Sequence, residues 1–230
     1  MSKLKRYLGF AALLFVFIGG TAASEASGQV LNSILTRMDN HNKALRSLRA
    51  DVTMVKENTQ LRVNDTTEGK VLYVPQRNSD PLVRIDWRSP DETFAVVKGT
   101  YIIYRPRLQQ YITGSTKQAK GKGTAGGALA FMNMSRAELR KNYEVVIVSE
   151  NASLSGGVST IHLKLTPKIK TSYQYAEVWV DSDGMPLQSK VVENNGDSTT
   201  ILLKNLEKNI TIDRSTFQVK LPPGTKRVDA

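Results

Sequence analysis

The residue types that most often carry catalysis are scarce in this chain of 230 residues. It contains no cysteine, which excludes disulfide bridges, cysteine nucleophiles and thiolate-bound metals. Its two histidines, His41 and His162, are far apart, and neither has a partner at a metal-ligand spacing. The carboxylates Asp181 and Asp183 lie at a turn, where such residues ordinarily bond to the backbone. We therefore expect a protein that is not an enzyme and that has no metal site and no cofactor.

One glycine-rich segment has the spacing of a nucleotide-binding loop. Residues 121–126 read Gly-Lys-Gly-Thr-Ala-Gly, a G-x-G-x-x-G pattern. In dinucleotide-binding folds this pattern directly follows a buried parallel strand. Here polar residues precede it and the neighbouring strands are predicted to be antiparallel, so we interpret the segment as a loop.

The chain is basic, with 32 Lys and Arg against 21 Asp and Glu, which gives a net charge of +11. The basic residues are scattered along the chain instead of forming one stripe with interleaved aromatics, so we expect no nucleic acid. Two interpretations stay open. The charge either forms an ordinary solvated surface, or it attracts anionic lipid headgroups or an acidic docking partner.

Residues 1–26 have the three-part pattern of a secretory signal peptide. Basic residues at positions 3, 5 and 6 precede an apolar run over 8–18, and small residues follow with cleavage sites at 21–23 or 24–26. The run is too short to span a ~30 Å hydrocarbon core, so we interpret it as cleaved, with a retained anchor as the alternative. No cysteine is present for lipid attachment, and a secreted domain without cysteine is typical of bacteria. We expect an exported, soluble periplasmic protein with one domain over 27–230.

The hydrophobic periodicity predicts a mainly β fold with helices (α+β). Apolar residues at spacings of three and four predict a helix over 29–48, broken near His41 and Asn42. From residue 49 the period becomes two, and Lys98-Gly99, Asp183-Gly184 and Asn195-Gly196 have the composition of hairpin turns. Eleven antiparallel strands in one chain favour a strongly curved sheet or barrel. The predicted strands are 48–56, 67–74, 82–87, 92–97, 101–105, 109–113, 143–148, 159–166, 174–181, 186–193 and 198–206.

A glycine- and lysine-rich segment over 113–127 interrupts the β pattern. It leads into a predicted amphipathic helix that starts at Ala128, and a helix after a flexible loop is a candidate lid. Alternating apolar residues, such as Ile85 with Trp87 and Phe94 with Val96, mark one face of each strand. Such a face is covered either by packed helices or by a ligand, and periodicity alone favours a plain core.

Motifs along nearly the whole chain resemble the LolA family of periplasmic outer-membrane lipoprotein carriers. In the N-terminal half these are Trp87 followed by Pro-Asp-Glu at 90–92, and the strand 99–106 ending in Arg-Pro. In the C-terminal half they are 178–181 (Val-Trp-Val-Asp), 184–186 (Gly-Met-Pro) and 217–225, where Phe217 precedes Pro-Pro-Gly-Thr.

The resemblance implies an incomplete antiparallel β-barrel of about eleven strands whose apolar concave face is covered by a helical lid. It also implies a chaperone that receives acylated lipoproteins, or related lipids, from an inner-membrane ABC-type release complex and delivers them to an outer-membrane acceptor. We expect a monomer. The alternative is a periplasmic module of the same fold that senses lipids or lipoproteins, and a structural envelope protein with a solid core is a third possibility. The sequence leaves open whether the cargo is a lipoprotein, a phospholipid or another amphiphile.

On this fold, the residues expected to line the acyl-binding cavity are Ile85, Trp87, Phe94, Tyr104 and Val178. The residues expected on the lid are Leu129, Phe131 and Met132. Members of the family typically have Lys-Arg-Pro after the second strand, and the arginine latches the lid. Here residues 74–78 read Val-Pro-Gln-Arg-Asn, so Arg77 is the latch candidate and Arg84 is the alternative.

Overall fold

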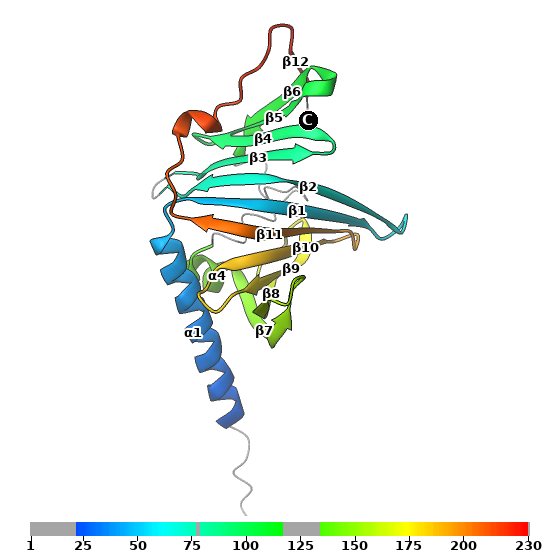
Figure 1. Cartoon of the computed structure of the whole chain (residues 1–230). Coiled ribbons are helices and arrows are strands. Elements are labelled where there is room, and N and C mark those ends of the chain that lie inside the picture. Colours follow the sequence, from blue (N-terminus) through cyan, green and yellow to red (C-terminus); the bar gives the residue numbers. More distant parts are fainter. Residues whose placement is uncertain (1–21, 77–78, 117–133, 230) are drawn as a thin grey trace, which may run out of the picture.

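The computed structural model describes residues 22–76, 79–116 and 134–229, and within these residues one 12-stranded sheet dominates (Figure 1). Two α-helices, α1 (Ala22–Ala44) and α4 (Arg136–Asn142), and two 3-10 helices, η1 (Pro106–Leu108) and η3 (Arg214–Phe217), accompany it. The strands are β1 (Leu48–Asn58), β2 (Val63–Val74), β3 (Leu82–Arg88), β4 (Asp91–Val97), β5 (Thr100–Arg105), β6 (Gln110–Ser115), β7 (Tyr143–Ser153), β8 (Ser159–Pro167), β9 (Tyr173–Val180), β10 (Pro186–Glu193), β11 (Ser198–Lys208) and β12 (Lys226–Arg227).

The sheet is open. Its strand order is β12-β6-β5-β4-β3-β2-β1-β11-β10-β9-β8-β7, so β12 and β7 are edges that do not pair with each other. All neighbours are antiparallel except β12, which pairs in parallel with β6. The predicted mainly β fold and incomplete barrel are confirmed. The two-residue strand β12 was not predicted.

The hairpin turns are those that the sequence indicates. Gly99, Gly184 and Gly196 have positive φ values of 75°, 91° and 89°. Each lies between strands that pair directly, β4 with β5, β9 with β10, and β10 with β11. The turn chemistry therefore fixes the order of the neighbouring strands.

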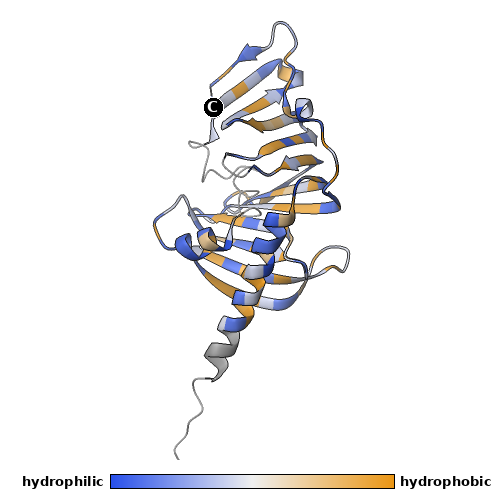
Figure 2. Cartoon of the chain, turned by 90° about the vertical axis from the view of Figure 1, so that its left-hand side faces the viewer, coloured by the Kyte–Doolittle hydropathy of each residue, from blue (hydrophilic) through white to orange (hydrophobic). Residues whose placement is uncertain are grey.

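Alternate residues of the strands form the core. We call the face of the sheet that carries Ile85 and Val178 the inner face, and the opposite face the outer face. Ile34, Leu35 and Met38 of α1 join the inner-face residues in one buried cluster. Figures 1 and 2 show α1 crossing the ends of the strands in the lower half, β11 to β7, whereas β3 to β6 form the upper half.

Helix α1 runs without a break through His41, contrary to the prediction. The amide of Leu45 donates to the carbonyl of His41 over 2.9 Å, and the side chain of Asn42 donates to the carbonyl of Met134 over 3.0 Å. These hydrogen bonds stabilise the last turn of α1, where polar residues interrupt the apolar periodicity that predicts a helix. Within the described residues, neither helix has the length and apolar content needed to cross a membrane.

Helix α4 corresponds to the C-terminal part of the helix predicted to start at Ala128. It begins at a capping box, in which the Ser135 side chain accepts from the Glu138 amide and the Glu138 carboxylate accepts from the Ser135 amide. Buried Leu139 anchors the helix to the core. Residues 128–133 of the predicted helix, and residues 1–21 of the predicted signal peptide, lie outside the described residues; α1 starts at Ala22, within the predicted signal peptide.

Candidate functional site: the inner face of the upper sheet

Three rows of directly paired residues cross the inner face of strands β2 to β6. The middle row is apolar throughout and consists of Val71, Ile85, Phe94, Ile103 and Ile112. The row on one side of it consists of Tyr73, Val83, Val96, Tyr101 and Gly114. The row on the other side begins with Gly69, Trp87 and Glu92. Because paired residues on neighbouring strands touch, the first two rows and Trp87 of the third row form one continuous apolar surface.

Two glycines let large rings lie flat on this surface. A Cβ at Gly69 would stand 3.0 Å from a ring carbon of Trp87 and 2.4 Å from the carbonyl oxygen of Asp86. A Cβ at Gly114 would stand 2.8 Å from the hydroxyl of Tyr101. The missing side chains therefore make room for the indole and the phenol.

Burial along the middle row is lowest at Phe94 and Ile103. Val71 and Ile85 at one end are 2% and 0% exposed and Ile112 at the other end is 7% exposed, whereas Phe94 and Ile103 between them are only partly buried. Tyr73 and Tyr101 in the adjacent row are also partly buried. The surface is thus solid core near β2 and β3 and partly accessible apolar surface over β4 and β5.

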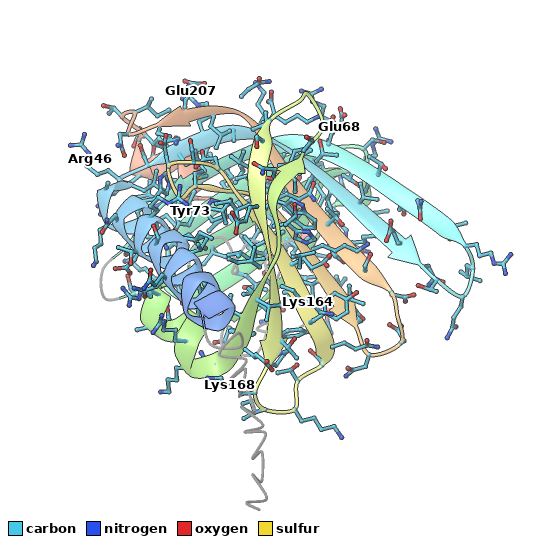
Figure 3. The ribbon with its side chains drawn as sticks, turned by 90° about the horizontal axis from the view of Figure 1, so that it is seen from below. Arg46, Glu68, Tyr73, Lys164, Lys168 and Glu207 are labelled. Carbon is cyan, nitrogen blue, oxygen red and sulfur yellow. The ribbon has the colours of Figure 1, made fainter. Side chains whose placement is uncertain are left out.

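Polar groups border this accessible surface. Arg105 Nε and Glu92 Oε2 form an ion pair of 2.8 Å at the edge of the third row. The hydroxyl oxygen of Tyr73 is buried and has no hydrogen-bond partner among the described residues. Burial raises the pKa of Tyr73, which keeps the hydroxyl protonated and able to donate. Figure 3 shows Tyr73 on the side of the sheet that α1 occupies.

The five residues expected to line a cavity are not equivalent in the structure. Ile85, Trp87 and Val178 are on the inner face, but they are 0%, 5% and 0% exposed and belong to the packed core. Phe94 is on the inner face and partly buried. Tyr104 pairs with Thr93 and Tyr111 and therefore lies on the outer face, contrary to the expectation.

The lid and its latch can be placed only in part. Leu129, Phe131, Met132 and the latch candidate Arg77 lie outside the described residues. The alternative latch, Arg84, lies on the outer face. Its guanidinium binds both carboxylate oxygens of Asp86, at 2.8 and 2.9 Å, and the carbonyl of Thr216 in η3 at 2.8 Å. Arg84 therefore attaches η3 to the sheet and does not face the inner surface.

Tyr73 and Ile103 belong to this surface but were not among the residues expected to line the cavity. Both could have been found by extending a known alternation, because Tyr73 follows Val71 by two positions and Ile103 follows Tyr101 by two. The run 101–104 is Tyr-Ile-Ile-Tyr, in which every residue is large and apolar, so hydrophobicity alone does not show which pair faces inward.

An aromatic and charged group occupies the outer face of β8 and β9. The rings of His162 and Trp179 stack with centroids 4.1 Å apart, and Lys164 Nζ lies 4.0 Å from the centre of the Tyr175 ring. The side chain of His162 is only 14% exposed and lies beside Glu177. Burial lowers the pKa of His162, and the charge of Glu177 opposes that shift.

Two open hollows among the described residues lie away from the inner face. One, of about 630 Å³, is an open depression along the β8–β9 turn, lined by residues such as Lys168, Lys170 and Asn194. The other, of about 470 Å³, lies between α1 and α4 and is described below. In the same residues no three potential ligands from His, Asp and Glu cluster closely enough to hold a metal ion.

Comparison with known proteins places the fold. The family profile "outer membrane lipoprotein carrier protein LolA" matches residues 43–220. No curated protein sequence matches the chain. Among solved structures, an uncharacterized conserved protein from Thermus thermophilus aligns with a TM-score of 0.54 and 12% identity, over 88% of this chain and 100% of that one.

Two further solved structures are similar over most of their length. A DUF1329 family protein from Desulfovibrio piger has a TM-score of 0.49 and 13% identity, over 84% of this chain and 97% of that one. A LolA superfamily protein from Nitrosomonas europaea has a TM-score of 0.41 and 16% identity, over 82% of this chain and 97% of that one.

Proposed function

Because the chain belongs to the family of the outer membrane lipoprotein carrier protein LolA, we propose that it binds the acyl chains of lipoproteins, or of related lipids, on its inner face. In this proposal it is a binding protein and not an enzyme. It crosses the periplasm as a soluble monomer of residues 27–230 after the signal peptide is removed. It takes its cargo from an inner-membrane ABC-type release complex and delivers it to an outer-membrane acceptor.

The observation that carries the proposal is the accessible apolar surface over β4 and β5. Phe94 and Ile103 face each other across the two strands, with Tyr101 beside them, and all three are only partly buried. An apolar surface that is only partly buried in an otherwise well-packed sheet is typical of a binding site for an apolar ligand. An extended acyl chain can lie along such a row of side chains.

Partial burial suits a carrier. Each buried methylene contributes about 0.8 kcal/mol, so ten of them contribute roughly 8 kcal/mol before the costs of binding. Complete enclosure of several long chains would hold the cargo too tightly to release it. A surface that is solid near β3 and open over β5 contacts one side of a chain, which keeps the affinity moderate.

The hydroxyl of Tyr73 supplies a polar contact for the same ligand. A buried hydroxyl without a partner costs about 1–3 kcal/mol, and a carbonyl oxygen of the ligand would remove that cost by accepting its hydrogen bond. Acyl chains of lipids and lipoproteins are attached through ester or amide carbonyls. We therefore place the carbonyl end of an acyl chain near Tyr73 and its methylenes toward Phe94 and Ile103. In this proposal Leu129, Phe131 and Met132 cover the chain and Arg77 holds that cover.

The experiment is to purify the protein from a periplasm, record its native mass spectrum, and extract what travels with it into organic solvent. A bound acylated lipoprotein or lipid supports the proposal and identifies the cargo. A protein that is folded but empty, and that also fails to take up an acylated peptide, contradicts it. A ligand that binds but is not transferred between membranes, together with a stable protein partner, would instead indicate a sensing module.

A further inference from the structure

A second, polar hollow lies between the two α-helices. It is a shallow depression of about 470 Å³ that is open to solvent. Its lining is Gly28, Gln29 and Asn32 from α1 and Arg136 and Arg140 from α4. No residue of the inner apolar surface contributes to it.

Both arginines are held in place by neutral oxygens. Arg136 Nη1 donates to the hydroxyl of Thr36 over 2.9 Å, and Arg140 Nη2 donates to the amide oxygen of Asn32 over 2.9 Å. Each guanidinium has five N–H donors, so most of the donors of each remain available. The two α1 partners lie one turn apart, as do the two arginines, and the guanidinium groups are therefore fixed side by side.

Neither Arg136 nor Arg140 forms an ion pair with a carboxylate among the residues whose side chains the structure describes, 28–76, 79–116 and 134–229. The carboxylate of Asp39 interacts with Arg136: the pKa of Asp39 is lowered first by its hydrogen bond with Lys43, to which it is paired at 2.6 Å, and also by a hydrogen bond from the backbone amide of Arg136 and by the charge of Arg136. Two like charges four residues apart on a helix repel each other, and an anion between them would remove that repulsion.

A third cation borders the helix pair. Lys168 Nζ donates to the carbonyl of Arg140 over 2.6 Å, and Figure 3 shows Lys168 beside α4. Its charge adds to the positive potential at this end of α4. A hollow with two guanidinium groups that keep most of their N–H donors, with side-chain amides beside them and a neighbouring lysine, favours an anion with several oxygen acceptors.

We propose that the hollow between α1 and α4 binds a phosphate group, with Arg136 and Arg140 donating to its oxygens and with Gln29 and Asn32 at its border. The fork of donors on a guanidinium matches a phosphate oxygen pair, and two such forks fit one tetrahedral anion. The group belongs either to a free phosphate compound or to a phospholipid headgroup. The proposal stands independently of acyl-chain binding on the inner face.

The test uses inorganic phosphate as the first probe. Titration of the purified protein, followed by NMR of the arginine side chains, is expected to shift the signals of Arg136 and Arg140. Arg136→Gln and Arg140→Gln are each expected to weaken binding about tenfold, which corresponds to the loss of one charge-assisted hydrogen bond. The matched control is Lys141→Gln, which removes the same charge from an exposed position of α4 that does not line the hollow.

A further variant, Gln29→Glu, separates loss of phosphate binding from loss of folding. The arginines bridge the helices, so their replacement can loosen α4. Gln29→Glu changes neither arginine and hardly changes shape, but it places a carboxylate in the hollow. It is expected to abolish phosphate binding while the melting temperature stays at or above that of the parent protein.

Vesicles distinguish the two sources of the phosphate group. The ligand is an anionic lipid headgroup if two results are found. Vesicles of phosphatidylglycerol bind the parent protein but not the Gln29→Glu variant, and vesicles of phosphatidylcholine bind neither protein. If only inorganic phosphate distinguishes the variants, the ligand is a soluble phosphate compound. The proposal is overturned if Lys141→Gln weakens binding as much as the arginine variants, or if Gln29→Glu binds phosphate like the parent protein.

Discussion

Gly184 in the β9–β10 turn lies directly against the backbone of Arg37 in α1. A Cβ at Gly184 would stand 2.4 Å from the carbonyl oxygen of Arg37. The contact is completed by Arg37 itself, whose Nη1 donates to the carbonyl of Ser182 in the same turn over 2.7 Å. Helix α1 therefore packs directly on the β9–β10 turn. The absence of a side chain at Gly184 determines how closely the helix approaches the sheet.

Gly184→Ala is therefore expected to be more destabilising than an ordinary glycine replacement in a turn. Gly156 is a matched control, because its φ of 93° is nearly that of Gly184 at 91°, but a Cβ there would meet nothing within 4 Å. We expect Gly156→Ala to cost about 1 kcal/mol through backbone strain, and Gly184→Ala about 2–4 kcal/mol because overpacking against α1 adds to it. Urea denaturation measures both. Equal losses would show that α1 moves aside freely.

The fold was predictable where local chemistry decides it. Alternating apolar residues predict the long strands, and the turn glycines predict the antiparallel pairs β4–β5, β9–β10 and β10–β11. The pairing of β1 with β11 joins segments far apart in the sequence, and no turn predicts it. Strand β12 has only two residues, and it exists because Lys226 pairs with Gln110 far away in the sequence. No periodic pattern can appear in so short a segment.

The residues of the candidate site were less predictable, because the face of the sheet on which a side chain lies depends on the register of its strand. Tyr104 was assigned to the inner face within a run of four large apolar residues, and a shift of one position exchanges the faces of a strand. Arg84 was a latch candidate by sequence position, but its pairing with Asp86 follows from both residues lying on the outer face. Only the pairing of β3 with β2 and β4 shows which residues of β3 lie on the same face of the sheet.

The two histidines predict that stability falls on mild acidification. Burial lowers the pKa of His162 and of His41, so the unfolded chain, with ordinary histidines, takes up protons first as the pH falls. The folded state is therefore most favoured above about pH 6.5 and loses stability as the pH falls through that value. Melting temperatures between about pH 7.5 and pH 5 should decrease less in His162→Gln and His41→Gln, and least in the double variant. An unchanged slope in the double variant would assign the effect to other groups.

A carboxylate on the outer face, Glu57, predicts a further loss of stability at lower pH than the histidines do. Glu57 Oε2 accepts from Ser198 Oγ over 2.6 Å and from Lys190 Nζ over 3.0 Å, which joins β1 to β10 and β11. These hydrogen bonds, first that of Ser198, lower the pKa of Glu57. Its contribution is therefore present above the ordinary pKa of a glutamate and is lost as the pH falls through the lowered value.

Glu57→Gln should accordingly destabilise the protein at neutral pH and have no effect in strong acid. The loss is expected to stay below about 1 kcal/mol, because the Glu57 side chain is 41% exposed and solvent screens the pair. Glu150→Gln on β7 is the control, since Glu150 is exposed and forms no ion pair within the described residues. A loss that persists at about pH 2 would mean that packing, and not the charge, is responsible.

Neighbouring residues on β5 provide the sharpest test of the inner-face site. Ile103 pairs with Phe94 and Ile112 on the inner face, whereas Tyr104 pairs with Thr93 and Tyr111 on the outer face, and both are partly buried. Ile103→Glu places a charge on the surface proposed for the acyl chain, and Tyr104→Glu places the same charge on the other side of the same strand. A fluorescent fatty acyl probe should bind at least about tenfold more weakly to Ile103→Glu, the factor that corresponds to about two lost methylene contacts.

Tyr104→Glu should bind that probe like the parent protein, provided that circular dichroism shows both variants folded. Ile85→Glu and Val178→Glu are unsuitable for this purpose, because those side chains are fully buried and a charge there would unfold the sheet. If both β5 variants fold and both bind the probe with parental affinity, the acyl chain does not lie over Ile103, and the partly accessible apolar surface over β4 and β5 has another partner. Loss of binding in Tyr104→Glu alone would move the site to the outer face.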